Sequence, residues 1–438
     1  MENSKQNNCG GLLQNVCLHG AEIAKLEILR EQGRATFAEV GLPSPKTEAW
    51  KYTRVREVAG ADFVIEPTGD DGHCCCGNHD CECEHEHQHC SCGHHVLPFD
   101  AYEIHFCNGK LKEDGFHLPD GVEVMSLLDA AADGELFAHL NKSFEMSNFP
   151  FAALNTAYIE QGVLLRVARD FCPDKPIALI NHTHAENKIF ANMRNVILLE
   201  NGAKATVVEY YHYSGAEKSA YFNNIVNEIF IGRNALLNHY KVQAEAFKAV
   251  HITLNAVAVK AGGKYESFCL QTGADLARHE THVVLKEEQA EAEVDAVYKM
   301  NGWATIDTTT DIEHLASYTH SNQLVKGIAG GQAKGVFQGK IHIAPMAEKT
   351  EGYQLHRALL LSDTAEIDVK PELEIFADDI KCSHGAACGE LDKEQMFYLQ
   401  SRGIAEDDAR AILIQAFADE GINKIKYEKI REWIRSLL

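Results

Sequence analysis

Between about residues 96 and 371, short runs of alternating apolar and polar residues follow one another, each after a turn rich in glycine or asparagine. Alternation puts successive side chains on opposite faces of a strand, so these runs predict strands with one buried face. Several recur roughly every 30 residues, which predicts the stacked coils of a β-solenoid. We expect no helix in this region, which argues against a βαβ fold. The period is irregular, so a β-sandwich remains an alternative. The clearest runs begin near residues 201, 232, 261, 291 and 331.

The two ends of the chain have the helical period instead. Residues 11–33 place apolar side chains at close to helical spacing, and we expect a helical N-terminal domain over residues 1–69. Near the other end, Asp392 can cap a helix with Gln395 at the third position. We expect a helical C-terminal domain over residues 371–438.

The segment 70–95 differs in composition from its surroundings. It holds half of the chain's 14 cysteines together with seven histidines, and no Lys or Arg. Such a segment cannot bury an apolar face, so without metal we expect it to be disordered. Thiolates and imidazoles bind zinc, iron and Cu(I), although the spacing does not match a zinc finger. The candidate ligands are Cys74, Cys75, Cys76, Cys81, Cys83, His85, His87, His89, Cys90 and Cys92.

Charge narrows the classes of function. The formal net charge of -23 argues against binding to nucleic acid or to an anionic membrane. No apolar run approaches the roughly 18 residues of a membrane span, and residues 1–8 lack the apolar core of a secretory signal. We therefore expect a cytoplasmic protein, in which cysteines serve metal or sulfur chemistry rather than a disulfide framework.

A strand that runs into a Cys-x-His-Gly turn is the most informative motif. Alternation predicts that Cys382 and His384 point the same way. A thiolate beside an imidazole suits iron, zinc or copper. The same pair could also serve a cysteine nucleophile with a histidine base, so both interpretations stay open.

One further histidine pair resembles a zinc motif without matching it. In His279-Glu280-Thr281-His282 there is one residue too few between the glutamate and the second histidine for both to share a helix face. We interpret these residues as part of a strand edge.

The C-terminal third as a whole resembles a known family. Its central motif is Ala377-Asp378-Asp379-Ile380-Lys381-Cys382-Ser383-His384-Gly385-Ala386. It is similar to the SufB/SufD family of iron–sulfur cluster assembly proteins, and the Ser383-His384-Gly385 form is similar to the SufD members. Supporting stretches are 337–341, 344–345, 349–354, 370–375 and 397–404, with weaker support from 48–53.

The resemblance implies a mainly β fold, a right-handed parallel β-helix core flanked by N-terminal and C-terminal helical domains. With the segment 70–95 as an insertion, the core would cover residues 96–370. Family members form a complex of one SufB, one SufD and two SufC ATPases. SufC binds the C-terminal helical domain, and the two β-helices meet at the nascent cluster. The resemblance assigns His384 to cluster assembly and Cys382 as a neighbouring candidate.

We therefore expect a non-catalytic scaffold subunit, associated with an ATPase, that shares a transient iron–sulfur cluster with a SufB-like partner. Zinc or iron would bind the segment 70–95. Reduced flavin has been considered for the family complex, although no motif here supports it, and a homodimer is an alternative assembly. Two rival functions remain, a metal buffer acting through residues 70–95 and a cysteine enzyme using Cys382 and His384.

Overall fold

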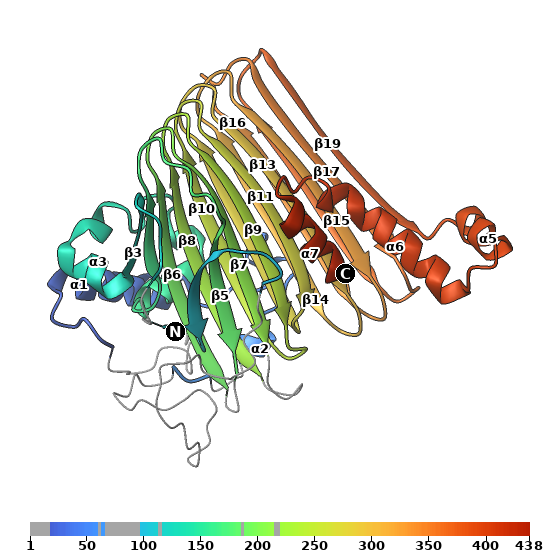
Figure 1. Ribbon diagram of the computed structural model, residues 1–438, viewed down its shortest axis with the longest axis horizontal. Coiled ribbons are helices and arrows are strands. Elements are labelled where there is room, and N and C mark those ends of the chain that lie inside the picture. The colour runs from blue at the N-terminus through green and yellow to red at the C-terminus, as the bar shows by residue number, and fades with distance from the viewer. Residues whose placement is uncertain (1–17, 60–62, 66–96, 113–115, 185–187, 214–219) are drawn as a thin grey trace, which may run out of the picture.

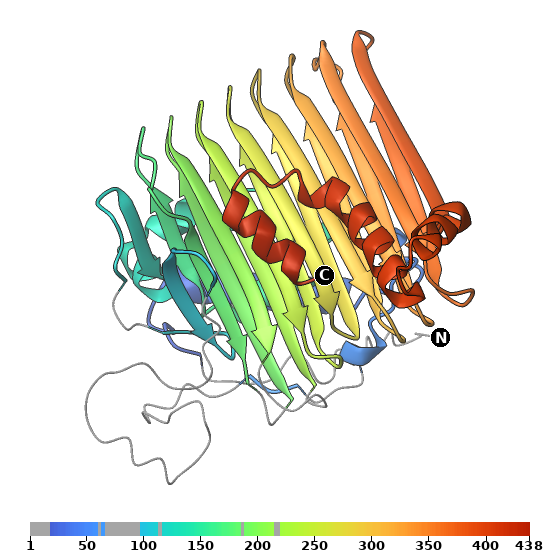
Figure 2. The same cartoon turned by 45° about the vertical axis from the view of Figure 1, so that its right-hand side comes forward.

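The computed structural model describes residues 18–59, 63–65, 97–112, 116–184, 188–213 and 220–438. Two long sheets face each other and form a parallel β-solenoid (Figures 1 and 2). Sheet A contains β3 (Val122–Ser126), β4 (Val163–Val167), β6 (Ile189–Leu199), β8 (Tyr221–Ile231), β10 (Val250–Val259), β12 (Leu276–Leu285), β14 (Thr305–His314), β16 (Lys334–Ile343) and β18 (Glu366–Ile375). Sheet B contains β2 (Lys110–Leu111), β1 (Tyr102–Cys107), β5 (Ile177–Thr183), β7 (Lys204–Tyr213), β9 (Leu236–Glu245), β11 (Lys264–Gly273), β13 (Glu291–Met300), β15 (His320–Ala329), β17 (Thr350–Leu360) and β19 (Ile380–Glu390).

From β4 onward the chain alternates between the sheets, so each strand pairs in parallel with the strand two places along. The predicted solenoid is confirmed, and the alternative of a β-sandwich is wrong. A ladder of asparagines inside the solenoid follows this register. The Asn195 amide donates to Asn227 at 2.9 Å, and Asn227 donates to Asn255 at 2.8 Å. Buried side chains that pair with their counterparts in the next coil hold the coils in register.

One left-handed residue recurs in each of the six turns from sheet A to sheet B between β6 and β17. Its φ lies between 55° and 74°, a conformation that glycine adopts without a steric cost and asparagine tolerates. Glycine and asparagine fill the position in the earlier turns, and other residues fill it later. This change explains why the repeat is easy to recognise from glycine and asparagine in the earlier turns of the sequence, and harder to recognise in the later turns. The residues are Gly202, Asn234, Gly262, Gln289, Tyr318 and Lys349.

Two α-helices interrupt the region expected to be free of them, so that expectation is wrong. They are α3 (Leu127–Asp133), which Ser126 caps by accepting from the Asp129 amide, and α4 (Pro150–Ala157). Every residue of α4 is buried, because it lies between α1 and sheet A. A helix buried on all sides has no amphipathic stripe, which removes the usual sequence signal. Short 3-10 turns flank these helices at Glu135–Ala138 and Met146–Asn148.

The first described helix, α1, covers Ala24–Val40 and so continues past Gly33, where the sequence predicted its end. Gly33 lies at a close crossing with α4. A Cβ there would come within 2.4 Å of the Ala157 backbone nitrogen, so only glycine allows this approach. The glycine therefore serves packing rather than termination. A 3-10 turn (Glu48–Trp50) and α2 (Arg56–Ala59) follow.

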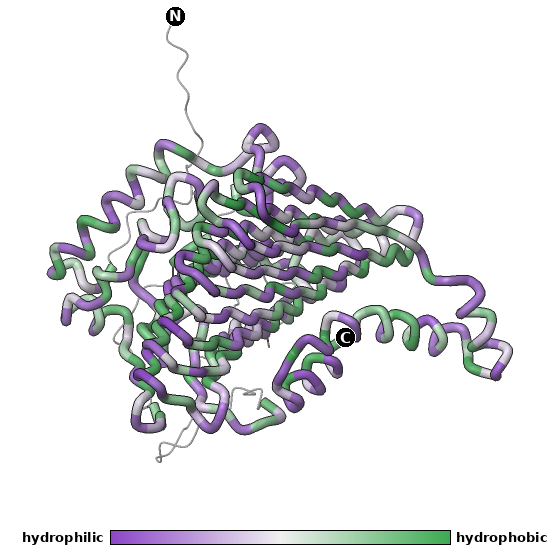
Figure 3. Tube along the Cα trace, turned by 90° about the horizontal axis from the view of Figure 1, so that it is seen from above, coloured by the Kyte–Doolittle hydropathy of each residue, from purple (hydrophilic) through white to green (hydrophobic). Residues whose placement is uncertain are grey.

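Three helices end the chain, namely α5 (Lys393–Ser401), α6 (Glu406–Ile422) and α7 (Glu428–Ser436). The Asp392 carboxylate accepts hydrogen bonds from the amides of Glu394 and Gln395, which confirms the predicted cap. Figures 2 and 3 show α6 and α7 lying along the outer face of sheet B, while α5 extends beyond its end. The strands themselves continue to Glu390, past the boundary expected at residue 370. None of the described helices is long and apolar enough to cross a membrane.

Candidate functional site

The C-terminal end of the solenoid consists of two strands with unpaired edges. Among the described residues, β18 is hydrogen-bonded only to β16, and β19 only to β17. No residue of β18 or β19 is buried, whereas every residue of β5 and β6 is. The solenoid therefore ends in an open coil that exposes its interior side chains and its backbone hydrogen-bonding groups.

Cys382 and His384 lie in this last coil, on the face of β19 that points into the solenoid. In the parallel register, Cys382 lies beside Gly352, and His384 lies beside Gln354, which is only 3% exposed. The Cys382 side chain packs at the rim of the cluster formed by Ile341, Ile343, Ala347 and Ala377 and is half-buried. His384, two residues further, is exposed. The strand thus presents both side chains toward the open end, as alternation predicts.

Burial determines the protonation of the thiols in this strand. It raises the pKa of Cys382, and it also raises the pKa of Cys388, an exposed cysteine further along the same face. A raised pKa leaves the thiol protonated near neutral pH, which disfavours a cysteine nucleophile. A bound metal ion, in contrast, displaces the thiol proton and forms the thiolate itself. The local chemistry therefore suits a metal ligand better than a nucleophile.

The coil that precedes the last one places buried polar and aromatic side chains next to it. The His356 imidazole accepts from or donates to the Tyr298 hydroxyl at 2.9 Å and stacks on Phe337, with ring centroids 5.0 Å apart. Burial lowers the pKa of His356 to about 4, so this ring is neutral. The Gln354 side chain donates to the Glu372 carbonyl at 3.4 Å, while its Oε1 is buried without a partner among the described residues.

Sequence reasoning missed Gln354 and His356. The signal that finds them is the repeat itself, because Gln354 pairs with His384 and His356 with Ala386 in the register of β17 and β19. A motif search along the chain does not compare residues one coil apart. These two residues therefore enter the candidate site only through the register.

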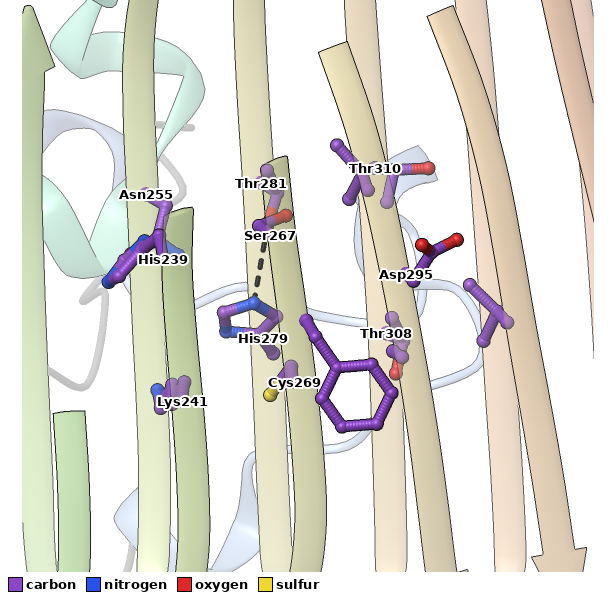
Figure 4. Close-up of a pocket in the computed structure, with 14 residues that line it drawn as sticks. His239, Lys241, Asn255, Ser267, Cys269, His279, Thr281, Asp295, Thr308 and Thr310 are labelled. Carbon is purple, nitrogen blue, oxygen red and sulfur yellow. Dashed lines mark hydrogen bonds between the residues drawn. The ribbon is translucent and has the colours of Figure 1, made fainter. Parts of the chain in front are cut away.

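A second polar cluster lies deeper in the solenoid, between the sheets (Figure 4). It includes His239, Lys241, Cys269 and His279, and its cavity of about 10 Å³ has room for about one water molecule. Burial raises the pKa of Cys269 to about 12, so its thiol is inert. Glu209 has its pKa lowered to about 2, because the His239 hydrogen bond and nearby charges outweigh burial. The cluster is too small for a substrate and satisfies its charges internally.

The other predicted positions have different outcomes. The candidate ligands from Cys74 to Cys92 lie outside the described residues, so that site stays a prediction. The His279–His282 stretch forms part of β12, which lies between β10 and β14, so its assignment to a strand edge is wrong. His279 points into the solenoid and His282 points out of it, because neighbours in a strand alternate.

Helix α5, which precedes α6, exposes aromatic residues to solvent. None of its residues is buried, and Phe397 is 73% exposed and Tyr398 57% exposed. In contrast, α7 buries Ile430, Trp433 and Ile434 against sheet B, and α6 is held by the Lys326 ammonium, which donates to the Phe417 carbonyl at 2.8 Å. The C-terminal helices are thus anchored at one end and exposed at the other.

Comparison with known proteins agrees with this architecture. The family model described as SUF system FeS cluster assembly, SufBD core domain, matches residues 181–417, and the model of the SufBD protein N-terminal region matches residues 14–179. The chain is 29% identical to the SufBD family protein slr0076 of Synechocystis over 438 residues, which cover 97% of this chain and 93% of the relative. It is also 29% identical to the iron–sulfur cluster assembly protein SufD of Escherichia coli over 444 residues, covering 98% and 96% of the two chains. The chloroplastic protein ABCI7 of Arabidopsis thaliana is 35% identical over 247 residues, covering 56% and 52%. The chain therefore belongs to the SufB/SufD family of iron–sulfur cluster assembly proteins.

Proposed function

We propose that this chain is a non-catalytic, cytoplasmic scaffold subunit of an iron–sulfur cluster assembly complex. Its open coil joins a SufB-like partner, and the nascent cluster is the cargo held between the two chains. The observation that carries the proposal is the position of Cys382 and His384 on the inward face of β19, at the unsealed end of the solenoid.

The unpaired edges of β18 and β19 support this mode of assembly. An exposed edge strand is a template for pairing with a strand of another chain, and monomers usually shorten, charge or cover such edges. Here the edge is 10 or 11 residues long in each sheet. A second solenoid stacked on it would also cover the partly exposed Ile367, Val369 and Leu373. Both backbone pairing and apolar burial thus favour a related solenoid as the partner.

The Cys382 thiol and the His384 imidazole are suitable ligands for iron that is held only during cluster assembly. A cysteine sulfur and an imidazole nitrogen on one strand face bind iron ions or cluster edges, and the partner chain would complete the coordination. Gln354 lies beside His384 in the register and would act as a positioning residue, since its unpartnered Oε1, which lies against Gly339, could accept the second ring N–H of His384 after a side-chain rotation. Such a partner orients a histidine ligand and raises its basicity.

A SufC-like ATPase would contact the chain at α5. The exposed aromatic residues of α5 lie on a helix that extends beyond sheet B, as Figure 3 shows. Exposed aromatic side chains on a rigid element are frequent anchors at protein interfaces. A SufC-like ATPase bound there could transmit nucleotide-driven motion through α6, which packs on β13 and β15.

The test is anaerobic reconstitution of the complex with SufB-like and SufC-like partners, read by the visible absorption of the cluster. His384→Ala should leave complex size unchanged and reduce cluster absorption by at least about tenfold, as expected for the loss of a ligand. Ser383→Ala is the matched control, because the neighbouring side chain points to the other face of β19. Normal cluster yield from His384→Ala, or equal loss in both variants, would overturn the proposal.

A further inference from the structure

A histidine and two carboxylates meet on the outer face of sheet A, away from the open coil. His282 of β12 lies in register with Asp311 of β14, and Glu313 is two residues further along β14 on the same face. Nδ1 of His282 is 3.8 Å from Oδ2 of Asp311, and its Nε2 is 3.7 Å from Oε1 of Glu313. One ligand atom from each of the three side chains lies within 4.8 Å of the others.

The histidine is buried but lacks a hydrogen bond at the nitrogen that faces Asp311. His282 is 8% exposed, and its Nδ1 is buried without a hydrogen-bond partner among the described residues. The same holds for Oδ1 of Asp311. Phe149 lies over the imidazole, with ring centroids 5.9 Å apart. A buried polar nitrogen without a partner is costly, and natural proteins usually satisfy it with an ion, a water or another residue.

We propose that His282, Asp311 and Glu313 form a binding site for one divalent transition-metal ion. Metal–ligand bonds of about 2.0–2.2 Å to nitrogen and oxygen require ligand atoms separated by roughly 3–4 Å. One atom from each of the three side chains already lies within 4.8 Å of the others, so small side-chain rotations would close the set around an ion. One imidazole and two carboxylates suit Mn²⁺, Fe²⁺ or Zn²⁺ better than the soft Cu(I) ion. The inference does not depend on the proposed role in cluster assembly.

Lys340 is the charge that would compete with the ion. It lies on β16 in register with Asp311, and its ammonium is 3.1 Å from Oε2 of Glu374. Burial opposes the charge of Lys340, but Asp311 and Glu374 stabilise it, so that its pKa is raised. Removing this ammonium should strengthen metal binding, which a purely structural ion-pair cluster would not produce.

The experiment is a titration of the full-length chain with Mn²⁺, read by the electron paramagnetic resonance signal of the free ion. Residues 70–95 also carry imidazoles and carboxylates that can bind Mn²⁺, so the site is identified by the equivalent that the ligand variants lose. We expect one of the bound equivalents to weaken at least about tenfold in His282→Ala and in Glu313→Gln. Lys340→Gln should raise the affinity about threefold to tenfold by removing a competing charge.

Glu366→Gln is the matched control, since Glu366 lies on the same face of sheet A but pairs with Lys334 at 3.0 Å. It should bind Mn²⁺ as the wild type does. An anomalous difference peak between His282, Asp311 and Glu313 in crystals soaked with Mn²⁺ would place the ion directly. Absence of binding by the wild type at millimolar Mn²⁺, or equal binding by the wild type and the two ligand variants, would overturn the inference. Because the readout is Mn²⁺ rather than a cluster, it is independent of the test of the proposed function.

Discussion

The two ends of the solenoid are built from the same coil but finish in opposite ways. At the N-terminal end, β3 pairs antiparallel with β4, β2 pairs antiparallel with β1, and Phe116, Leu118 and Phe171 pack against the interior cluster. At the C-terminal end, β18 and β19 leave their edges unpaired and their interior side chains partly exposed. One end is sealed within the chain itself, and the other is not.

The sealed end contributes to the stability of the chain by itself, whereas the open end leaves a surface available to a partner. A sealed coil buries more of its apolar side chains and resists pairing with another strand. An open coil leaves part of that burial to be gained on association. The candidate ligands Cys382 and His384 lie in the open coil, so the same surface would complete the fold of the complex and enclose the cargo.

The largest expected effect is a contrast in stability between the two ends. Ile197 on β6 is fully buried in the interior cluster, so Ile197→Ala should lower the free energy of unfolding by about 2–5 kcal/mol. Leu373 in the last coil is only partly buried, and Leu373→Ala should cost about 1 kcal/mol or less in the isolated chain. Urea unfolding of both variants measures the contrast. Equal losses would show that the last coil is already sealed.

A second, smaller effect concerns the covered middle of sheet B, where the pKa of Asp295 is raised to about 7 by burial. The folded state thus holds this proton more tightly than the unfolded state, whose pKa is near 3.8. Stability should therefore fall as the pH rises from about 4 to 7. Asp295→Asn should flatten this part of the curve and stabilise the chain at pH 8, by at most about 4 kcal/mol. Thermal unfolding from pH 4 to 8 tests this, and parallel curves for the two proteins would contradict it.

The smallest expected change in stability is at α5. Phe397→Ala removes a side chain that is 73% exposed, so the free energy of unfolding should change by less than about 0.5 kcal/mol. Binding to the SufC-like ATPase should nevertheless weaken at least about tenfold if α5 is the docking element. Calorimetric titration measures the affinity, with Phe247→Ala as a control because Phe247 is 52% exposed in a turn far from α5 along the chain. Equal affinity for wild type and Phe397→Ala would exclude α5 as the contact.

Local signals in the sequence predicted much of this fold. Alternation and turn residues predicted the coils, Asp392 predicted the start of α5, and strand periodicity put Cys382 and His384 on one face. Each of these depends on neighbours in the chain, which a single sequence displays directly.

Features that depend on contacts between distant segments were not predicted. In the sequence Gly33 indicates a helix end, and only the packing of α4 against it shows its role. Helix α4 itself lacks an amphipathic stripe because it is buried on every side. The group of His282, Asp311 and Glu313 exists only once β12 and β14 are in register. Residues one coil apart become neighbours through the register, and no local motif encodes it.

Hydrogen exchange of the backbone amides in residues 366–390 tests the central claim most directly. The chain would be measured alone and in complex with the proposed SufB-like partner. The account predicts at least about tenfold slower exchange in β18 and β19 within the complex, since new interchain hydrogen bonds would protect their edge amides, with little change in β3 and β4. A stable complex in which exchange in residues 366–390 is unchanged would contradict the claim that the open coil is where the partner binds.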